Sequence, residues 1–288
     1  MSQSRLLVPV ANPETADRLL DTAIEIARDR DLEIHVLHVV TVPMQLSLEH
    51  ARRSLDTDEG ESTVEYAVEQ AQAADVPATG RVRFGRDVAR SILNVAGSTD
   101  AETILLGWRG RPRRRDVILG SYIDEVLANA SCDVAVKRID REGGDVASVL
   151  VPVAGGPNTE YAAELAGAVA RGNDASVELV TVVSPGAGDD AVADGRDLLT
   201  RTSPSLGAVE TVTETVLRGD DVVETIVDRS SDHDVTVVGA AEDGLLQRVL
   251  VGSIPQAVGR QADGAVIMAK RHQGVSTALR RRVRDVLR

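Results

Sequence analysis

The chain contains an internal duplication. LVPVA stands at residues 7–11 and again at 150–154, and three longer segments recur in the same order. LEIHVLHVV (32–40) parallels ASVELVTVV (175–183), GRDVARSIL (85–93) parallels GDDVVETIV (219–227), and STDAETILLG (98–107) parallels SSDHDVTVVG (230–239). A repeat offset of 132 to 143 residues fits two domains of ordinary size. The polar stretch 139–145 predicts their boundary, giving domains at 1–141 and 146–272 and a basic tail at 273–288.

Each copy alternates strand and helix patterns. Short apolar runs predict strands at 5–10, 33–40, 79–84, 102–107 and 133–138. Helical spacing of apolar residues predicts helices at 14–30, 61–74, 87–97 and 121–130, with an irregular stretch after residue 40. The second copy follows the same plan from 147 to 271. Nearly continuous apolar strands joined by helices predict α/β domains with doubly wound parallel sheets.

Composition excludes several classes of protein. Hydrophobic residues make up 43% of the chain, but no run of eighteen is apolar, so no membrane span is expected. Cys132 is the only cysteine, which excludes an intrachain disulfide. The first residues lack a signal-peptide pattern, so a cytoplasmic protein is expected. A net charge of −13 argues against nucleic acid as a partner.

The charge balance has two readings. Asp and Glu number 45, the only lysines are Lys137 and Lys270, and aromatic residues make up 2% of the chain. This composition is typical of a salt-loving microbe such as a haloarchaeon. A GC-rich genome, which favours Arg, Ala, Val and Gly, would give a similar result, and both readings stay open.

The loop after the fourth predicted strand carries the clearest ligand signal. Gly107, Gly110, Gly120 and Ser121 form the pattern G-x2-G-x9-G-S. Glycines let the backbone approach a phosphate chain closely, and free amides at the start of the next helix attract an anion. In doubly wound sheets, ligands bind beyond the carboxyl ends of the strands, where this loop lies.

With this motif, the strand-one LVPV and the apolar last strand, the chain resembles the ATP-binding class of the universal stress protein family over roughly residues 4–271. The resemblance implies a Rossmann-like, five-stranded parallel sheet in each domain, of the adenine nucleotide alpha hydrolase-like type. It also implies pairing of the domains along their last strands into an intrachain pseudo-dimer, with a further homo-dimer left open. The implied ligand is ATP or AMP, with Mg²⁺ as an optional companion. Its expected contacts are Pro9, Val10, Ala11, Asn12, Val39, Val40, Gly107, Arg109, Gly110, Gly120, Ser121 and Tyr122.

Two departures from the family pattern matter. Ala11 stands where ATP-binding members usually carry an aspartate for the ribose, and Asn12 is only a partial substitute. In the second copy, Glu242 replaces the second glycine of the motif and would repel a polyphosphate. The residues Gly239, Glu242, Gly252 and Ser253 therefore predict a degenerate second site. The second domain is expected to serve mainly as a pairing partner.

The loop between the glycines is rich in arginine. Arg109 is expected to touch a ligand phosphate, since a guanidinium matches phosphate oxygens, and Trp108 is expected to stack on a base or an arginine. The outer arginines, at 111 and 113–115, have the alternative role of solvated charges that balance an acidic protein.

No other constellation predicts catalysis. His35 and His38 fall on opposite faces of a strand and cannot share a metal, and Cys132 is expected to be an inert thiol. No metal site and no acid–base pair are expected, which favours a non-enzymatic, nucleotide-binding regulatory protein of the stress response. The alternative is a nucleotide-free module that regulates a membrane transporter or another protein. A slow ATPase or autophosphorylating protein that uses Ser121 ranks third.

The tail at 273–288 has two readings. Its basic, amphipathic pattern suits a helix docked on an anionic surface or a partner, and equally a helix packed on the protein's own acidic body.

Overall fold

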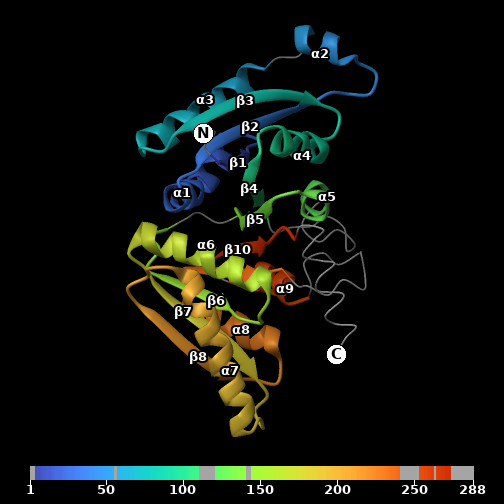
Figure 1. Cartoon of the computed structure of the whole chain (residues 1–288). Coiled ribbons are helices and arrows are strands. Elements are labelled where there is room, and N and C mark those ends of the chain that lie inside the picture. Colours follow the sequence, from blue (N-terminus) through green and yellow to red (C-terminus); the bar gives the residue numbers. More distant parts are fainter. Residues whose placement is uncertain are drawn as a thin grey trace.

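The chain folds around one continuous sheet of ten strands in the order β3-β2-β1-β4-β5-β10-β9-β6-β7-β8. The computed structural model describes residues 4–54, 57–109, 121–140, 144–240, 253–262 and 264–273. Figure 1 shows the two repeats lying one above the other, with β5 and β10 at their junction. All pairings within each repeat are parallel, and only β5 and β10 run antiparallel. The predicted pair of five-stranded doubly wound domains, joined along their last strands, is therefore confirmed.

The elements of domain 1 follow the predicted order. They are β1 (Arg5–Pro9), α1 (Pro13–Arg30), β2 (Glu33–Thr41), α2 (Leu48–Ser54), α3 (Asp58–Ala73), β3 (Ala78–Gly85), α4 (Val88–Ser98), β4 (Ala101–Trp108), α5 (Ser121–Asn129) and β5 (Asp133–Arg138). The expectation of an irregular stretch after β2 was wrong in part, because α2 lies within it. This helix has only seven residues, too few for a helical periodicity to be read from sequence.

Domain 2 repeats the plan with one short 3-10 helix added. Its elements are β6 (Ser148–Pro152), α6 (Pro157–Asn173), β7 (Ser176–Val183), α7 (Asp189–Thr202), η1 (Ser203–Leu206), β8 (Val212–Arg218), α8 (Val222–Ser230), β9 (Val235–Gly239), α9 (Ser253–Gln261) and β10 (Ala265–Lys270).

Helices cover both faces of the sheet. The apolar faces of α1, α3, α6 and α7 pack on one side, and those of α4, α5, α8 and α9 pack on the other. Strand β1 shows how one strand serves both layers, since Leu6 and Val8 belong to the first core and Leu7 to the second. Alternation along a parallel strand with two covered faces produces the continuous apolar run seen in the sequence.

The junction is held by two basic side chains that reach across it in opposite directions. Arg138, at the end of β5, donates to the carbonyl oxygens of Gly259 (2.9 Å) and Ala262 (2.8 Å) at the end of α9. Lys270, at the end of β10, donates to the carbonyl of Leu127 in α5. Each domain thus stabilises the carboxyl end of the other's last helix, where a cation is favoured by the helix dipole.

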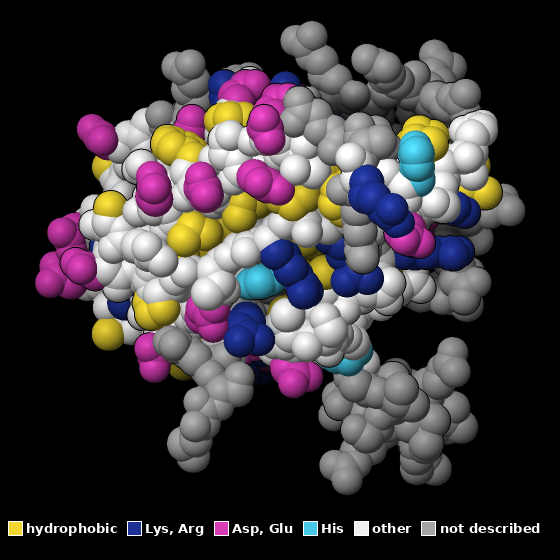
Figure 2. Space-filling model, turned by 90° about the horizontal axis from the view of Figure 1, so that it is seen from above, with side chains coloured by type: hydrophobic (Ala, Val, Ile, Leu, Met, Phe, Trp, Pro, Cys, Tyr) yellow, Lys and Arg dark blue, Asp and Glu magenta, His cyan; other side chains and the backbone are white. Residues whose placement is uncertain are grey.

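The outer edges of the sheet are β3 and β8. Strand β3 carries Arg81 and Arg83, and Arg86 follows it. Seen from the β3 end, acidic and basic side chains gather in separate groups on this part of the surface (Figure 2). Charged side chains on an edge strand oppose the addition of another strand.

Candidate functional site

The strand order of domain 1 reverses between β1 and β4, and the predicted nucleotide contacts lie around the carboxyl ends of these strands. Pro9 ends β1, and the buried Val10 donates its N–H to the carbonyl of Leu37 in β2 at 2.9 Å. His38 donates from Nδ1 to the Val10 carbonyl at 3.1 Å. The backbone at the end of β1 is therefore fixed against β2. Ala11 is exposed beside it.

Asn12 has a structural task at this point. Its Oδ1 accepts hydrogen bonds from the N–H and the hydroxyl of Thr15, both at 2.9 Å, and so caps the amino end of α1. Because this oxygen already accepts two hydrogen bonds within α1, it does not take the place of the ribose-binding aspartate that is missing at Ala11. Val39 and Val40, the expected neighbours of the base, lie half-buried near the end of β2.

The end of β4 brings Gly107 and Arg109 to the same edge. A Cβ at Gly107 would meet Ile139 Cδ1 at 2.8 Å, so only glycine fits there without a shift of that side chain. Arg109 is exposed and pairs through Nη2 with Glu14 Oε2 at 3.0 Å. Glu14 also pairs with Arg18 at 3.2 Å. The guanidinium expected to touch phosphate is thus held at the first turn of α1 by a carboxylate that the sequence did not single out.

The expectation that Trp108 stacks on a base was wrong. Its side chain is 3% exposed and belongs to the core beneath α4, α5, α8 and α9. A Cβ added to Gly259 of α9 would come within 2.9 Å of the indole, so the ring packs against domain 2. The alternation of residues along a strand predicts which face of the sheet a side chain lies on. It does not predict that a second domain covers that face.

The remaining motif residues are only partly described. Gly110, Gly120 and the outer arginines lie outside the described residues. Ser121 begins α5, and Tyr122 is 40% exposed and donates its hydroxyl to the Gly107 carbonyl at 3.2 Å. The amino end of α5 thus stands beside the end of β4, as an anion site of this type requires.

The corresponding edge of domain 2 is arranged differently. Gly239 ends β9, and a Cβ there would lie 2.8 Å from the backbone of Asn158, in the first turn of α6. The buried Asn158 donates to the Ala240 carbonyl at 2.7 Å and accepts from the N–H of Arg271 at 2.9 Å. Helix α6 is therefore fastened to the ends of β9 and β10, and β9 is one of the two strands at the switch point of domain 2. Glu242 and Gly252 are outside the described residues, and Ser253 begins α9.

His35 and Cys132, the other candidate residues, lie in partly or largely buried positions. The ring of His35 contacts the hydroxyl of Thr79 at 3.0 Å, and burial, with the nearby Arg81 and Arg5, lowers its pKa. Burial raises the pKa of the Cys132 thiol to about 12, which keeps it protonated and unreactive. Across the described ranges, no group of three or more His, Cys, Asp and Glu side chains is placed to hold a metal ion. No helix among the described residues has the length and apolar character to cross a membrane.

Two doubly wound domains joined edge to edge, with a glycine motif at one switch point, define a tandem α/β protein. The universal stress protein family matches residues 3–138 and again 146–270, and the chain belongs to this family.

Its relatives include proteins of two kinds. It is 27% identical over 228 residues to the universal stress protein Rv2624c of Mycobacterium tuberculosis, covering 75% of this chain and 80% of that protein. It is 25% identical over 265 residues to the Na(+)/H(+) antiporter NhaS5 of Synechocystis. That match covers 91% of this chain and 38% of the antiporter. The crystal structure of a universal stress protein from Archaeoglobus fulgidus has the same fold, with a TM-score of 0.68, 17% identity and coverage of 93% and 97%.

Proposed function

We propose that this protein is a regulatory universal stress protein that binds one adenine nucleotide, ATP or AMP, in domain 1. The observation that carries the proposal is the difference between the two switch points. In domain 1, Arg109 and the amino end of α5 stand at the end of β4, next to the glycine motif. In domain 2, the buried Asn158 instead ties α6 to the residues that follow β9 and β10. One site for each chain follows.

The proposed site binds without catalysing. The glycine motif and the end of α5 supply amides for phosphate oxygens, and Arg109 supplies a guanidinium when it leaves Glu14. The described residues provide no carboxylate–histidine pair at the end of β4 that would activate a water molecule. Mg²⁺, if it accompanies ATP, would be held chiefly by the phosphates.

The test is the nucleotide content of the purified chain, released by acid and separated by chromatography, together with calorimetric titration of ATP and AMP in molar KCl. About one adenine nucleotide per chain, abolished by Gly110→Glu, is expected. The absence of both bound nucleotide and titration heat would refute the proposal.

A second candidate function rests on the antiporter relative. A match over 91% of this chain to part of a Na(+)/H(+) antiporter favours a module that regulates a membrane transporter. The loss of the aspartate at Ala11 points the same way, since it weakens the case for nucleotide. Cross-linking in native membranes, followed by mass spectrometry of the partners, tests this alternative. Recovery of a transporter supports it, and recovery of no membrane protein contradicts it.

A further inference from the structure

A cavity of about 890 Å³ lies between the two domains. Helix α1 forms one wall along much of its length, from Glu14 to Arg28. The link at 144–146 and the first residues of β9 and β10 form the opposite wall. The volume is within the range of small-molecule sites, which often lie between domains.

Among the described residues, the two sides of the junction differ. The two repeats are offset by 143 residues in this region. This offset separates LVPVA at 7–11 from LVPVA at 150–154, and it separates the left-handed residues Asp31 and Asp174, which end α1 and α6. By the same offset, Arg18 of α1 corresponds to Tyr161 of α6. On the other side, the fully buried Tyr161 fills the equivalent place between Arg30 and Arg271, whose guanidinium carbons lie 5.2 and 4.8 Å from the ring centre. Arg18 instead turns to Glu14 and leaves the space open.

Lys137 projects into this layer from the middle of the sheet. It lies on β5 between Ala135 and Ile139, which belong to the core under α1 and α6, and it pairs with Ile267, which also lines the cavity. Within the described part of the chain, no hydrogen bond or ion pair is recorded for its amine. Lys270, in contrast, donates to a helix carbonyl. Lys270 therefore has a structural role at the domain junction, whereas no structural contact accounts for the amine of Lys137 among the described residues.

Glu25 of α1 stands close to this amine. Its Oε1 accepts from Asn173 Nδ2 at 2.6 Å, and its Oε2 is buried without a hydrogen-bond partner among the described residues. Burial raises the pKa of Glu25 to about 7, although Asn173 and Lys137 act in the opposite direction. Burial lowers the pKa of Lys137, against the attraction of Glu25 and Asp21. The pair therefore combines an amine whose positive charge is disfavoured by burial with a carboxyl that can give or take a proton near pH 7.

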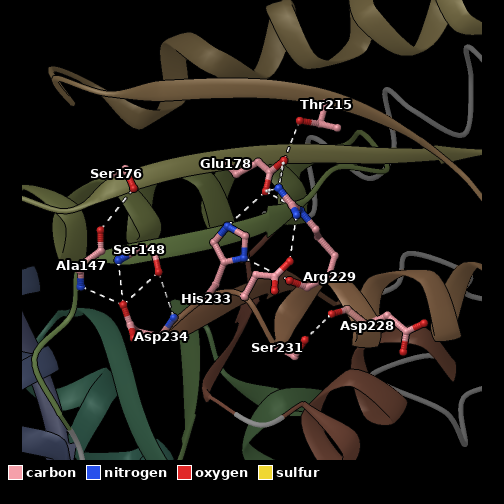
Figure 3. A network of polar contacts seen from close by, with 11 residues as sticks. Ala147, Ser148, Ser176, Glu178, Thr215, Asp228, Arg229, Ser231, His233 and Asp234 are labelled. Carbon is pink, nitrogen blue, oxygen red and sulfur yellow. Dashed lines mark hydrogen bonds and ion pairs between the residues drawn. The ribbon is translucent and has the colours of Figure 1, made fainter.

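The other charged groups of the cavity have mixed signs. Asp234 is engaged by the N–H groups of Ala147 and Ser148 and by the Ser148 hydroxyl, and His233 contacts Glu178 and the Arg229 carbonyl (Figure 3). Carboxylates such as Asp21 and Glu25 line the cavity together with the guanidinium groups of Arg18, Arg28 and Arg138. A cation or an anion therefore meets groups of its own sign as well as of the opposite sign. A small neutral carbonyl compound meets neither penalty.

We propose that Lys137 is the amine of an interdomain site that captures a small neutral aldehyde as an imine. The Nζ lone pair attacks the carbonyl carbon, and a proton passes from the nitrogen to the carbonyl oxygen, giving a carbinolamine. Glu25 then protonates the hydroxyl, which leaves as water as the C=N bond forms, and the Glu25 carboxylate takes the remaining proton from the nitrogen. No oxidant or other co-reactant is needed.

The test is reductive trapping on the full-length chain. The protein is incubated with acetaldehyde and sodium cyanoborohydride near pH 7, and ethylation of each lysine is followed by peptide mass spectrometry. Lys137 is expected to be labelled severalfold faster than Lys270, because Lys137 lines the cavity whereas the Lys270 amine donates to the Leu127 carbonyl. Equal rates, or labelling of Lys270 alone, would overturn the proposal.

Two variants separate the parts of the site. Arg18→Tyr introduces the residue that fills the other side of the junction, and it should slow Lys137 labelling severalfold without touching that amine. Glu25→Gln keeps the shape but removes the proton donor, and it should also slow labelling. Circular dichroism confirms that each variant is folded. Labelling of Lys137 that is unchanged in both variants would show that neither the cavity nor Glu25 takes part.

Discussion

The two domains share one fold and one order of elements, yet they use the same two places differently. At the switch point, domain 1 has an exposed Arg109 beside a helix end, whereas domain 2 has a buried Asn158 that ties α6 to the strand ends. Beside the junction, domain 1 has a charged cavity along α1, whereas domain 2 has a tyrosine that fills the corresponding space. At the switch points the two domains differ in the side chains that join the first helix to the strand ends, and beside the junction domain 2 is filled where domain 1 has a cavity.

This difference teaches how a duplicated domain can diverge without a change of fold. The closed places in domain 2 are built from single side chains that satisfy backbone groups or fill volume, and such residues stabilise the structure. The cavity beside α1 in domain 1 leaves polar groups available to a ligand. Domain 2 thus supports the structure on which domain 1 presents its groups.

The largest expected effect is at the filled side of the junction. Tyr161→Ala should lower the free energy of unfolding by about 4 kcal/mol, because it leaves a large void and removes the ring between two cations. Urea denaturation measures the loss. The matched control is Tyr66→Ala, since Tyr66 is 36% exposed and should cost under about 1 kcal/mol. Equal losses for the two variants would show that Tyr161 does not hold the domains together.

The open side should respond to pH in the range where Glu25 titrates. The folded-state pKa of Glu25 is raised from 4.5 to about 7, so the folded chain holds this proton more tightly than the unfolded chain does. The stability contributed by the proton is complete below pH 4.5 and is lost as the pH rises through 7. Compared with Glu25→Gln, the free energy of unfolding of the wild type should fall by about 3 kcal/mol as the pH rises across this window, which corresponds to the full pKa shift. If the free energies of unfolding of the two proteins changed equally between pH 4.5 and 8, this prediction would be wrong.

The two cross-domain caps offer a third comparison. Arg138→Met should lower the free energy of unfolding by about 2 kcal/mol more than Lys270→Met, because Arg138 donates to several buried carbonyls and Lys270 donates to one. Thermal and urea unfolding of both variants give the difference. A larger loss for Lys270→Met would reverse the assignment of the stronger cap.

The smallest expected effect concerns the nucleotide. Arg109→Ala should weaken AMP or ATP binding about tenfold, which is about 1.4 kcal/mol, through loss of one charge-assisted contact. Glu14→Gln releases the guanidinium from its carboxylate and should strengthen binding slightly. Titration calorimetry checks both changes. Unchanged affinity in Arg109→Ala would remove this residue from the site.

Much of the fold follows from local patterns in the sequence. The repeat and the apolar runs predict the ten strands and most helices, because burial on both faces leaves a continuous apolar signature at each strand. The pairing of the last strands was implied by the family resemblance rather than by any pattern. Trp108 shows the limit, since its strand position gave no sign that α9 would cover it.

The candidate site was predictable only in part. The glycine motif and its position after β4 were visible in the sequence. The roles of Glu14, Asn158, Arg138 and Tyr161 were not, because each depends on a contact between segments far apart in the chain. A signal existed for Lys137 and Lys270, since a chain with only two lysines places both in its last strands.

The most direct test of the account is the number of nucleotides bound by three proteins in calorimetric titration with AMP: the wild type, Gly110→Glu and Glu242→Gly. The account predicts one, none and one, because restoring the glycine in domain 2 leaves Asn158 and α6 in place. Two nucleotides bound to the wild type, or binding that survives Gly110→Glu, would contradict the claim that domain 1 alone carries the site.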